Sequence, residues 1–304
     1  MNEASHDHAK VGGTDRPNHD RLVLLGTKGG PAIHPGSPMP TSTLVEMAGR
    51  RVVVDCGLGV TRGLCGAGVR LPAIDAIVVT HLHSDHVLEF GPLVLTAWMA
   101  GLDRPIRVAG PPGLAALWDA FLASMRVDVA IRVEDEGRPH PRDLVEIEEC
   151  EGGTLLDLPG LGIEAMPVPH PPVEPTLALR FLGENGRTRL ALSADTAYHP
   201  PLAGFARDAD VLVHEAMLPA GVDALVARIG NGARLREHLV ASHTSAPDAG
   251  RIASLAGVGH LVLHHLVPSD DPDFSEADWI AAVRGTWDGE LTIGRDGLAI
   301  PLGG

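Results

Sequence analysis

The chain has 304 residues, of which 44% are hydrophobic, and its 24 lysines and arginines against 39 aspartates and glutamates give a formal charge of −15. This composition supports a substantial core and excludes general disorder. The negative charge disfavours a general nucleic-acid binder, because such a surface repels phosphate backbones. With three cysteines, no membrane-length apolar run and no apolar leader, the sequence predicts a cytoplasmic protein without a membrane partner.

In chain order, a polar tail over residues 1–20 is predicted to be disordered. Short apolar runs bounded by turn residues predict the strands of the first half, at 21–26, 43–47, 51–55, 74–80 and 106–109. Helical spacing of apolar residues predicts helices at 87–99 and 113–125. Residues 133–160 are acidic, so we expect an irregular, fold-specific insertion with a solvated face there.

The second half repeats this content. Strands are predicted at 162–168, 176–182, 188–193, 211–213 and 260–263, followed by a helix at 275–284 and a hairpin of 291–293 with 298–300. Strands that come first and then alternate with helices predict an α/β (α+β) fold. In it, two sheets pack face to face and helices cover both outer faces. Because the sequence shows no linker, residues 21–304 are predicted to form a single domain.

The segment Thr80-His81-Leu82-His83-Ser84-Asp85-His86 places three imidazoles and a carboxylate directly after an apolar strand. A tight turn from strand to helix can direct His81 and His83 to one side and Asp85 and His86 to the other. Such nitrogen and oxygen ligands suit two Zn²⁺ ions, with Mn²⁺ or Fe²⁺ as alternatives. A histidine-rich surface turn would give no reason for the motif to follow a buried strand.

This His-x-His-x-Asp-His motif resembles the signature of the metallo-β-lactamase superfamily, an αββα sandwich with its metals at one edge. The resemblance implies more ligands at later strand ends, where His170, Asp195 and the pair His264–His265 stand. The implied ligand sets are His81, His83 and His170 for one ion, Asp85, His86 and His265 for the other, and Asp195 as the bridge. The usual phasing of this group favours His265 over His264. A capping or core role for His170 and a turn role for Asp195 remain alternatives.

Four further segments, 26–31, 54–57, 210–216 and 241–245, resemble the ribonuclease-Z-like branch and in particular its small bacterial arylsulfatase-like members. The resemblance covers about residues 21–300. It implies that the His214-Glu215 stretch and His243 meet at the site, with His214 in a supporting position. The Glu215 carboxylate could then orient His243 and raise its pKa, so that His243 donates a proton to the leaving group. A structural His–Glu pair is the alternative.

Asp55, at the end of the strand at 51–55, is predicted to orient a ligand histidine, unless it is an ordinary strand-end turn residue. The predicted catalytic residues are thus Asp85, His243 and Glu215. Trp98, Tyr198 and His199 are predicted either to line the pocket or to pack. The apolar stretch 90–99 could serve a homodimer or belong to the core.

The predicted activity is hydrolysis of a small anionic ester, an aryl sulfate or a phosphodiester, by a hydroxide that bridges two metals. Histidine at position 83 favours hydrolysis over redox chemistry, because the oxygen-reducing relatives carry a carboxylate there. Lactones and other carboxylic esters are the next substrates. Transfer-RNA 3′ processing is disfavoured, because the processing relatives carry a long basic arm where this chain, between His170 and Asp195, has room for two strands and a turn. A metal-binding scaffold without turnover is the remaining alternative.

Overall fold

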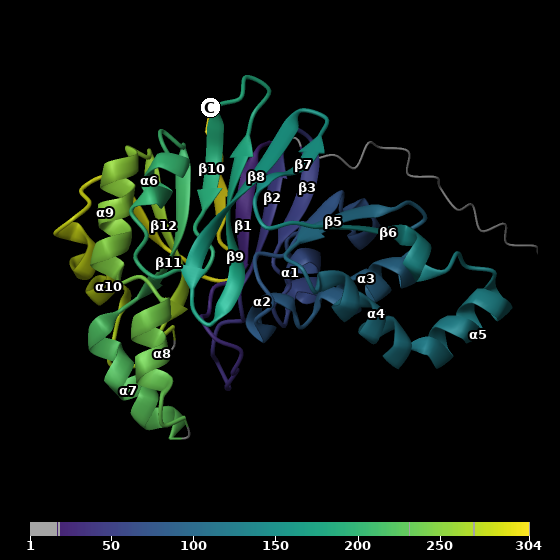
Figure 1. The fold of residues 1–304 in the computed structure, drawn as a ribbon, viewed down its shortest axis with the longest axis horizontal. Coiled ribbons are helices and arrows are strands. Elements are labelled where there is room, and N and C mark those ends of the chain that lie inside the picture. The colour runs from purple at the N-terminus through teal and green to yellow at the C-terminus, as the bar shows by residue number, and fades with distance from the viewer. Residues whose placement is uncertain (1–16, 18, 231, 270, 304) are drawn as a thin grey trace, which may run out of the picture.

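The computed structural model describes residues 17, 19–230, 232–269 and 271–303, so most of the tail predicted at 1–20 lies outside the described residues. Two seven-stranded mixed sheets pack face to face, and helices cover both outer faces (Figure 1). This arrangement confirms the predicted α/β fold, an αββα sandwich. Side chains of both sheets form one shared core, and we therefore propose that residues 21–304 are a single domain.

The first sheet combines the N-terminal strands with the last strand of the chain, in the order β14-β1-β2-β3-β4-β5-β6. Pairing is antiparallel from β14 to β3 and parallel from β3 to β6. Its strands are β1 (Arg21–Gly26), β2 (Ser42–Met47), β3 (Arg50–Val54), β4 (Ala76–Val78), β5 (Ile106–Gly110), β6 (Val145–Glu149) and β14 (Ala299–Pro301).

The second sheet has the same plan, in the order β13-β12-β11-β10-β9-β8-β7. Pairing is parallel from β13 to β10 and antiparallel from β10 to β7. Its strands are β7 (Gly153–Leu158), β8 (Leu161–His170), β9 (Val173–Leu182), β10 (Thr188–Leu192), β11 (Val211–Met217), β12 (His260–Val267) and β13 (Glu290–Ile293). In both sheets, loops leave the carboxyl ends of parallel strands, where open sheets commonly bind ligands.

The helices divide between the two halves of the chain. They are α1 (Val60–Gly66), α2 (Ser84–Val87), α3 (Phe90–Met99), α4 (Leu114–Ser124), α5 (Arg126–Glu136), α6 (Pro201–Phe205), α7 (Pro219–Ile229), α8 (Leu235–Ser242), α9 (Ala246–Ala256) and α10 (Glu276–Arg284). Side chains of α1, α3 and α4 pack on the first sheet, and those of α6, α9 and α10 pack on the second.

The strand β3 shows why the sequence forms this sandwich. Val53 points outward into the layer under α1 and α3, whereas Val52 and Val54 point into the layer between the sheets. Successive side chains of a strand face opposite sides, so a strand that is covered on both faces needs a continuous apolar run. The run Val52-Val53-Val54 meets this need, and all three side chains are buried.

The expectation of an irregular insertion at 133–160 is wrong. This segment contains the end of α5, a short 3₁₀ helix at Pro141–Leu144, and the strands β6 and β7, which lie at one edge of each sheet. In β6, Val145 and Ile147 pack against the core of the first layer while Glu146 and Glu148 alternate with them. The acidic residues therefore belong to the solvated face of an edge strand.

The predicted C-terminal hairpin is also wrong. β13 pairs with β12 in the second sheet, whereas β14 pairs with β1 in the first. The two short strands therefore join the edges of different sheets. Turn residues between two strands identify a reversal of the chain but not the partner of each strand.

Two further expectations about the helices need correction. The predicted helix at 87–99 is interrupted between α2 and α3, and Trp98 lies in the core with its Nε1 donating to the Pro139 carbonyl. Trp98 therefore does not line the pocket, and most of the stretch 90–99 is buried in the core, as the second of the two alternatives for this stretch predicted. The hairpin of α7 and α8, which projects below the second sheet (Figure 1), was not predicted.

Among the described residues, no helix has the length and apolar character that crossing a membrane requires.

Candidate metal centre

The turn that follows β4 positions the contiguous motif. Asp55 follows β3 with a positive φ of 60°, and its carboxylate accepts hydrogen bonds from the backbone N–H (2.7 Å) and the hydroxyl of Thr80. The same carboxylate lies 2.7 Å from Nδ1 of His86. The short helix α2 starts after His83 and places Asp85 and His86 in its first turn. One carboxylate at the end of the neighbouring strand thus holds both ends of the motif.

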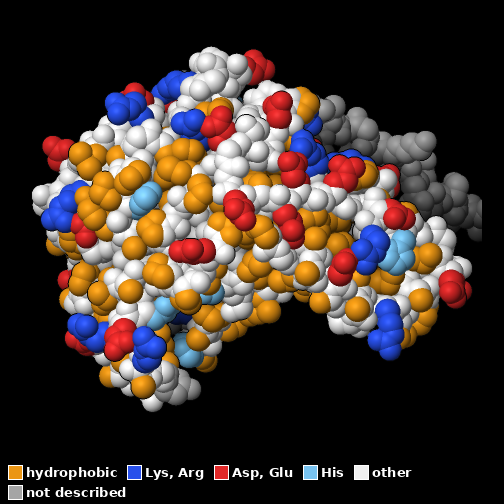
Figure 2. All heavy atoms as spheres, in the orientation of Figure 1, with side chains coloured by type: hydrophobic (Ala, Val, Ile, Leu, Met, Phe, Trp, Pro, Cys, Tyr) orange, Lys and Arg blue, Asp and Glu red, His pale blue; other side chains and the backbone are white. Residues whose placement is uncertain are grey.

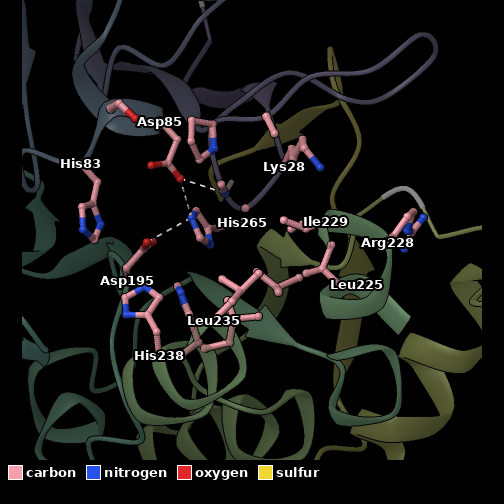
Figure 3. Close-up of a pocket in the computed structure, with 18 of the residues that line it drawn as sticks. Lys28, His83, Asp85, Asp195, Leu225, Arg228, Ile229, Leu235, His238 and His265 are labelled. Carbon is pink, nitrogen blue, oxygen red and sulfur yellow. Dashed lines mark hydrogen bonds and ion pairs between the residues drawn. The ribbon is translucent and has the colours of Figure 1, made fainter. Parts of the chain in front are cut away.

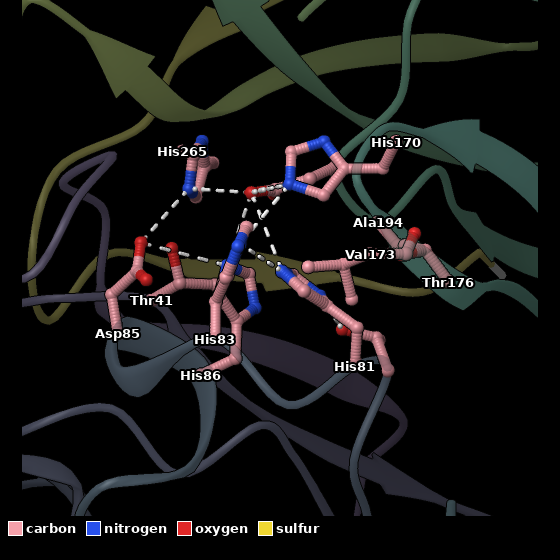
Figure 4. A network of polar contacts seen from close by, with 12 residues as sticks. Thr41, His81, His83, Asp85, His86, His170, Val173, Thr176, Ala194 and His265 are labelled. Atoms are coloured by element: carbon pink, nitrogen blue, oxygen red, sulfur yellow. Dashed lines mark hydrogen bonds and ion pairs between the residues drawn. The ribbon is translucent and has the colours of Figure 1, made fainter. Parts of the chain in front are cut away.

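The first group of converging side chains consists of His81, His83, His170 and Asp195. Nδ1 of His83 lies 3.1 Å from Nε2 of His81 and 3.1 Å from Nε2 of His170 (Figure 4). Oδ2 of Asp195 lies 3.8 Å from each of those two Nε2 atoms. His170 ends β8, and its Nδ1 lies 2.9 Å from the carbonyl of Ser242, which leaves Nε2 facing the group.

The second group consists of Asp85, His86, Asp195 and His265. Oδ2 of Asp195 lies 3.0 Å from Nε2 of His265 and 3.3 Å from Nε2 of His86. Oδ2 of Asp85 lies 3.4 Å and 3.7 Å from the same two nitrogens. The Asp195 oxygen thus faces both groups, which is the position required of a bridging ligand.

Both groups fit divalent cations. Ligand atoms at about 2.0–2.1 Å from a tetrahedral ion lie roughly 3.3 Å from one another, close to the separations found here. Nε2 of His86 is buried without a hydrogen-bond partner, although its Nδ1 has one. An imidazole oriented by a carboxylate through one nitrogen and open at the other is the usual arrangement of a ligating histidine. The absence of thiolates in both groups suits zinc, manganese or iron.

His264 and His265 are neighbours with different partners. In the pairing of β11 with β12, Glu215 faces His264 and Ala216 faces Leu266, so His265 is an extra residue, and its φ is 43°. Such a β-bulge redirects a side chain. His264 Nε2 lies 2.8 Å from the carbonyl of Gly26, whereas His265 Nε2 faces Asp85 and Asp195. The geometry therefore favours His265 as the ligand.

Asp195 is placed by an unusual backbone conformation in the turn after β10. Ala194 has a positive φ of 53°, which a residue other than glycine seldom adopts. Of the five such residues in the described chain, Asp55, Ala194 and His265 are all at this centre. Backbone strain that concentrates in one place is typical of functional sites.

His243 and Glu215 form a pair beside the ligands. Nδ1 of His243 lies 3.2 Å from both carboxylate oxygens of Glu215, and the His243 ring stacks on that of His265 at a centroid distance of 5.4 Å. Glu215 also accepts hydrogen bonds from the backbone of Thr196 and Thr244. Glu215, His243 and His265 form a third converging group that shares His265 with the second. His214, which precedes Glu215 in β11, is buried, and its Nδ1 lies 2.7 Å from the Glu215 carbonyl oxygen. It therefore supports the backbone of β11 and does not face the ligands.

Burial and neighbouring charges separate the histidines into two electrostatic classes. Burial lowers the pKa of His81 and lowers that of His170 to about 4, which favours the neutral form that binds metals. Burial alone would also lower the pKa of His265 and His243. The carboxylates of Asp195 and Asp85 instead raise the pKa of His265 to about 10, and Glu215 raises that of His243. A metal that takes His265 must therefore displace a proton.

The ligands open into a cavity of about 630 Å³ (Figure 3). His83, Asp85, Asp195, His243 and His265 line it, together with the loop after β1 and the α7–α8 hairpin. Several histidines reach the concave side of the molecule beside that hairpin (Figure 2). The cavity volume lies in the range of small-molecule sites. Tyr198 and His199 are not among the lining residues, so the first of the two alternatives for them, a place in the pocket wall, is wrong.

Several polar residues that line this cavity were not predicted from the sequence, among them Lys28, Arg228 and His238. Lys28 lies in the loop after β1, with Nζ 3.3 Å from the hydroxyl of Ser269, and Arg228 lies on α7, paired at 2.6 Å with Asp271. His238 lies on α8, with its ring centroid 6.3 Å from that of His83. Lys28 lies in the segment 26–31, which resembles the ribonuclease-Z-like branch. In contrast, no local sequence pattern predicts that the α7–α8 hairpin lies beside the cavity.

Comparison with known proteins identifies the family. Residues 21–243 match the family model described as Anti-Pycsar protein Apyc1, which covers well over half of the chain. The chain belongs to this family. It is also ribonuclease Z-like: ribonuclease Z of Mycobacterium sp. (strain KMS) is 34% identical over an alignment of 286 residues that covers 90% of this chain and 93% of that protein. Ribonuclease Z of Mycobacterium marinum is 32% identical over 278 residues, at 90% and 96% coverage.

Solved structures agree on the fold of this family member. The metallo-β-lactamase-fold protein YhfI from Bacillus subtilis superposes with a TM-score of 0.67 at 21% identity, over 93% of this chain and 99% of that one. The short form of human tRNase Z superposes with a TM-score of 0.66 at 19% identity and the same coverage. The metallo-β-lactamase and ribonuclease Z-like resemblance is thus confirmed, and the chain has a metallo-hydrolase fold with His/Asp groups suited to divalent metals. The arylsulfatase-like part of the resemblance stays a prediction.

Proposed function

We propose that this chain is a dinuclear metal-dependent phosphodiesterase that acts on small anionic esters. The observation that carries the proposal is the pair of ligand groups that share one oxygen of Asp195 and open together into a cavity of small-molecule size. A phosphodiester is preferred to a sulfate ester because the relatives at 32–34% identity are named ribonucleases, which act on phosphodiester bonds.

We infer that the first cation is held by His81, His83 and His170, the second by Asp85, His86 and His265, and both by Asp195. Zinc is the favoured metal because imidazole dominates the donor set, with manganese or iron as alternatives. Two such cations would acidify a water and polarise the phosphoryl group.

The proposed task of His243 is to give a proton to the leaving oxygen. Its Nδ1 faces Glu215, so Nε2 is left for the substrate, and it lines the cavity. The raised pKa of His243 keeps the imidazole charged as a donor. Glu215, held by two backbone N–H groups, fixes the ring orientation.

Cleavage of RNA is the second candidate function, because of the relatives named ribonuclease Z. Two observations count against it as the main activity. The stretch between His170 and Asp195 consists of β9, a turn and β10. The arginines of the projecting hairpin, Arg228, Arg234 and Arg236, each pair with a carboxylate and so contribute little positive charge toward a phosphate backbone.

The test is a substrate panel on the zinc- or manganese-loaded protein: bis-p-nitrophenyl phosphate, p-nitrophenyl sulfate, a lactone and a 3′-extended tRNA precursor. We expect turnover of the phosphodiester to exceed that of the sulfate and the lactone, and precursor cleavage to be slow. If cleavage of the tRNA precursor dominates, the function is RNA processing and the proposal is wrong. If turnover of the sulfate or the lactone dominates, the proposed substrate class is wrong. A metal-loaded protein that turns over none of the four substrates would support the metal-binding scaffold.

A further inference from the structure

A short segment directly after β1, residues 27–30, holds the backbone of β12 beside the candidate ligand His265. The carbonyl of Thr27 accepts a hydrogen bond from the N–H of Leu266 at 2.9 Å, and the N–H of Gly29 donates to the carbonyl of Leu266 at 3.1 Å. A Cβ at Gly29 would lie 3.0 Å from Cε1 and Nδ1 of His265, so the segment and this ring are in close contact. The segment therefore fixes β12 immediately after the bulge that turns His265 toward the other ligands.

The same segment holds the Asp85 carboxylate. The N–H of Gly30 donates to Oδ2 of Asp85 at 2.9 Å. This is the oxygen that lies 3.4 Å from Nε2 of His265 (Figure 3) and 3.7 Å from Nε2 of His86. Hydrogen bonds from outside a ligand set commonly orient its carboxylates. Asp85 and His265 thus share one support, whereas His86 is held separately by Asp55.

The base of this segment is held by a carboxylate from near the C-terminal end of the chain. Asp296 lies between β13 and β14, where the chain crosses from the second sheet to the first. Its Oδ1 accepts hydrogen bonds from the backbone N–H (3.0 Å) and the hydroxyl (2.7 Å) of Thr27, and its Oδ2 accepts one from the N–H of Met39 at 2.7 Å. Hydrogen bonds to an ionised carboxylate are among the strong ones. Asp296 therefore holds both ends of the loop that joins β1 to β2.

The turn that carries Asp296 is itself attached to both sheets. The N–H of Gly297 donates to the carbonyl of Leu24 in β1 at 2.7 Å, and the N–H of Gly294 donates to the carbonyl of Leu263 in β12 at 2.8 Å. The position of the carboxylate is thus set by the two strands and not by the loop that it holds.

We propose that Asp296 is a positioning residue for the second cation. Through Thr27 it fixes the segment 27–30, and this segment fixes two ligands of the second group. The first group is supported from another element, since Nδ1 of His170 lies against the end of α8. Loss of the Asp296 carboxylate should therefore weaken the second cation and spare the first. The inference rests on the proposed function, because it uses the two ligand sets inferred there.

The test measures zinc affinity by competition with a chelator and needs no turnover. In His170→Ala, which should retain the second ion, the added substitution Asp296→Ala should lower the zinc affinity about tenfold, as losses of outer support commonly do. In His86→Ala, which should retain the first ion, Asp296→Ala should leave the affinity unchanged. The control is Asp288→Ala, at an exposed aspartate between α10 and β13, and should change neither affinity. Equal losses for both ions, or an unchanged affinity of the second, would overturn the proposal.

Two milder substitutions test the same role if Asp296→Ala does not fold. Asp296→Asn keeps one oxygen acceptor but replaces the other by an NH₂ donor, and Thr27→Val removes one hydrogen bond. Each should weaken the second ion less than Asp296→Ala would. Amide hydrogen exchange adds a readout without metal: the N–H groups of Gly29 and Gly30 should exchange faster in both variants than in Asp288→Ala. Unchanged exchange at both glycines would contradict the positioning role.

The positioning role and the proposed function can fail separately. A chain that binds two zinc ions and responds to Asp296→Ala only at the second, but hydrolyses no phosphodiester, would keep the positioning role and refute the enzyme. Hydrolysis of bis-p-nitrophenyl phosphate by the parent chain, with both zinc affinities unchanged in Asp296→Ala, would keep the enzyme and refute the positioning role.

Discussion

The two sheets supply the candidate metal centre in different ways. The first sheet contributes His81, His83, Asp85 and His86 from one turn after β4, so six successive residues carry four candidate ligands. The second sheet contributes its three ligands from separate places: the end of β8, the turn after β10 and a bulge in β12. Local sequence therefore sets one half of the centre, whereas strand pairing sets the other half.

The supports differ in the same way. Asp55, which holds His86, follows a strand adjacent to β4 in the first sheet. His170 is instead held by the carbonyl of Ser242, from the end of α8. A substitution in the first half should therefore disturb only the turn after β4. A substitution at His170 should also disturb the end of α8 in the α7–α8 hairpin.

The largest effect is expected where the two halves meet. Asp195→Asn keeps the shape of the side chain but removes the charge of the oxygen that faces both groups, so both metals should be lost or greatly weakened. Activity on bis-p-nitrophenyl phosphate should fall about a thousandfold or more. Elemental analysis of the purified variant measures the metals, with the exposed Asp223→Asn on α7 as the control. Two metals per chain in Asp195→Asn would refute the bridge.

The next prediction compares one ligand from each half. His86→Ala should lose at least one metal per chain, and His170→Ala should lose the other ion while the group around His86 persists. Activity should fall about a hundredfold or more in both, because the proposed reaction uses two cations. Elemental analysis with a zinc competition titration tests this, and retention of two metals by His86→Ala would make the ligand assignment wrong.

A smaller effect is expected from Glu215→Gln. This substitution changes the carboxylate that orients the proposed proton donor His243 and leaves the two main ligand groups intact. We expect two metals to remain and kcat to fall about a hundredfold. The loss should be greater for a diester with a poor alcohol leaving group than for one with p-nitrophenolate, because only the former needs the proton. Equal losses with both substrates would show that Glu215 acts only on the structure.

The smallest effect is expected from Asp55→Asn in the first sheet. The amide can still accept hydrogen bonds from Thr80 but stabilises the metal-bound imidazole of His86 less, so metal affinity should fall about 10- to 100-fold. A chelator competition assay measures the change, with the exposed Asp157→Asn on β7 as the control. Unchanged affinity would mean that Asp55 is an ordinary strand-end residue.

The choice between His264 and His265 shows where sequence reasoning stops. Both follow the same apolar run, and in a regular strand they would simply face opposite sides. The bulge at His265 decides which one faces the candidate ligand groups, and it arises from the pairing of β12 with β11. The edge strand β14 shows the same limit, because its partner β1 lies near the other end of the chain.

The sequence by itself determined the sandwich fold and the contiguous half of the centre. Alternating and continuous apolar runs decide which faces are buried, and six neighbouring residues cannot separate in space. The resemblance implied Asp195 as the bridge and favoured His265, but only the tertiary structure shows that one Asp195 oxygen faces both groups, that a bulge turns His265 toward them, and that the α7–α8 hairpin walls the cavity. These features depend on strand register and on contacts between residues that are far apart along the chain, so no local pattern specifies them.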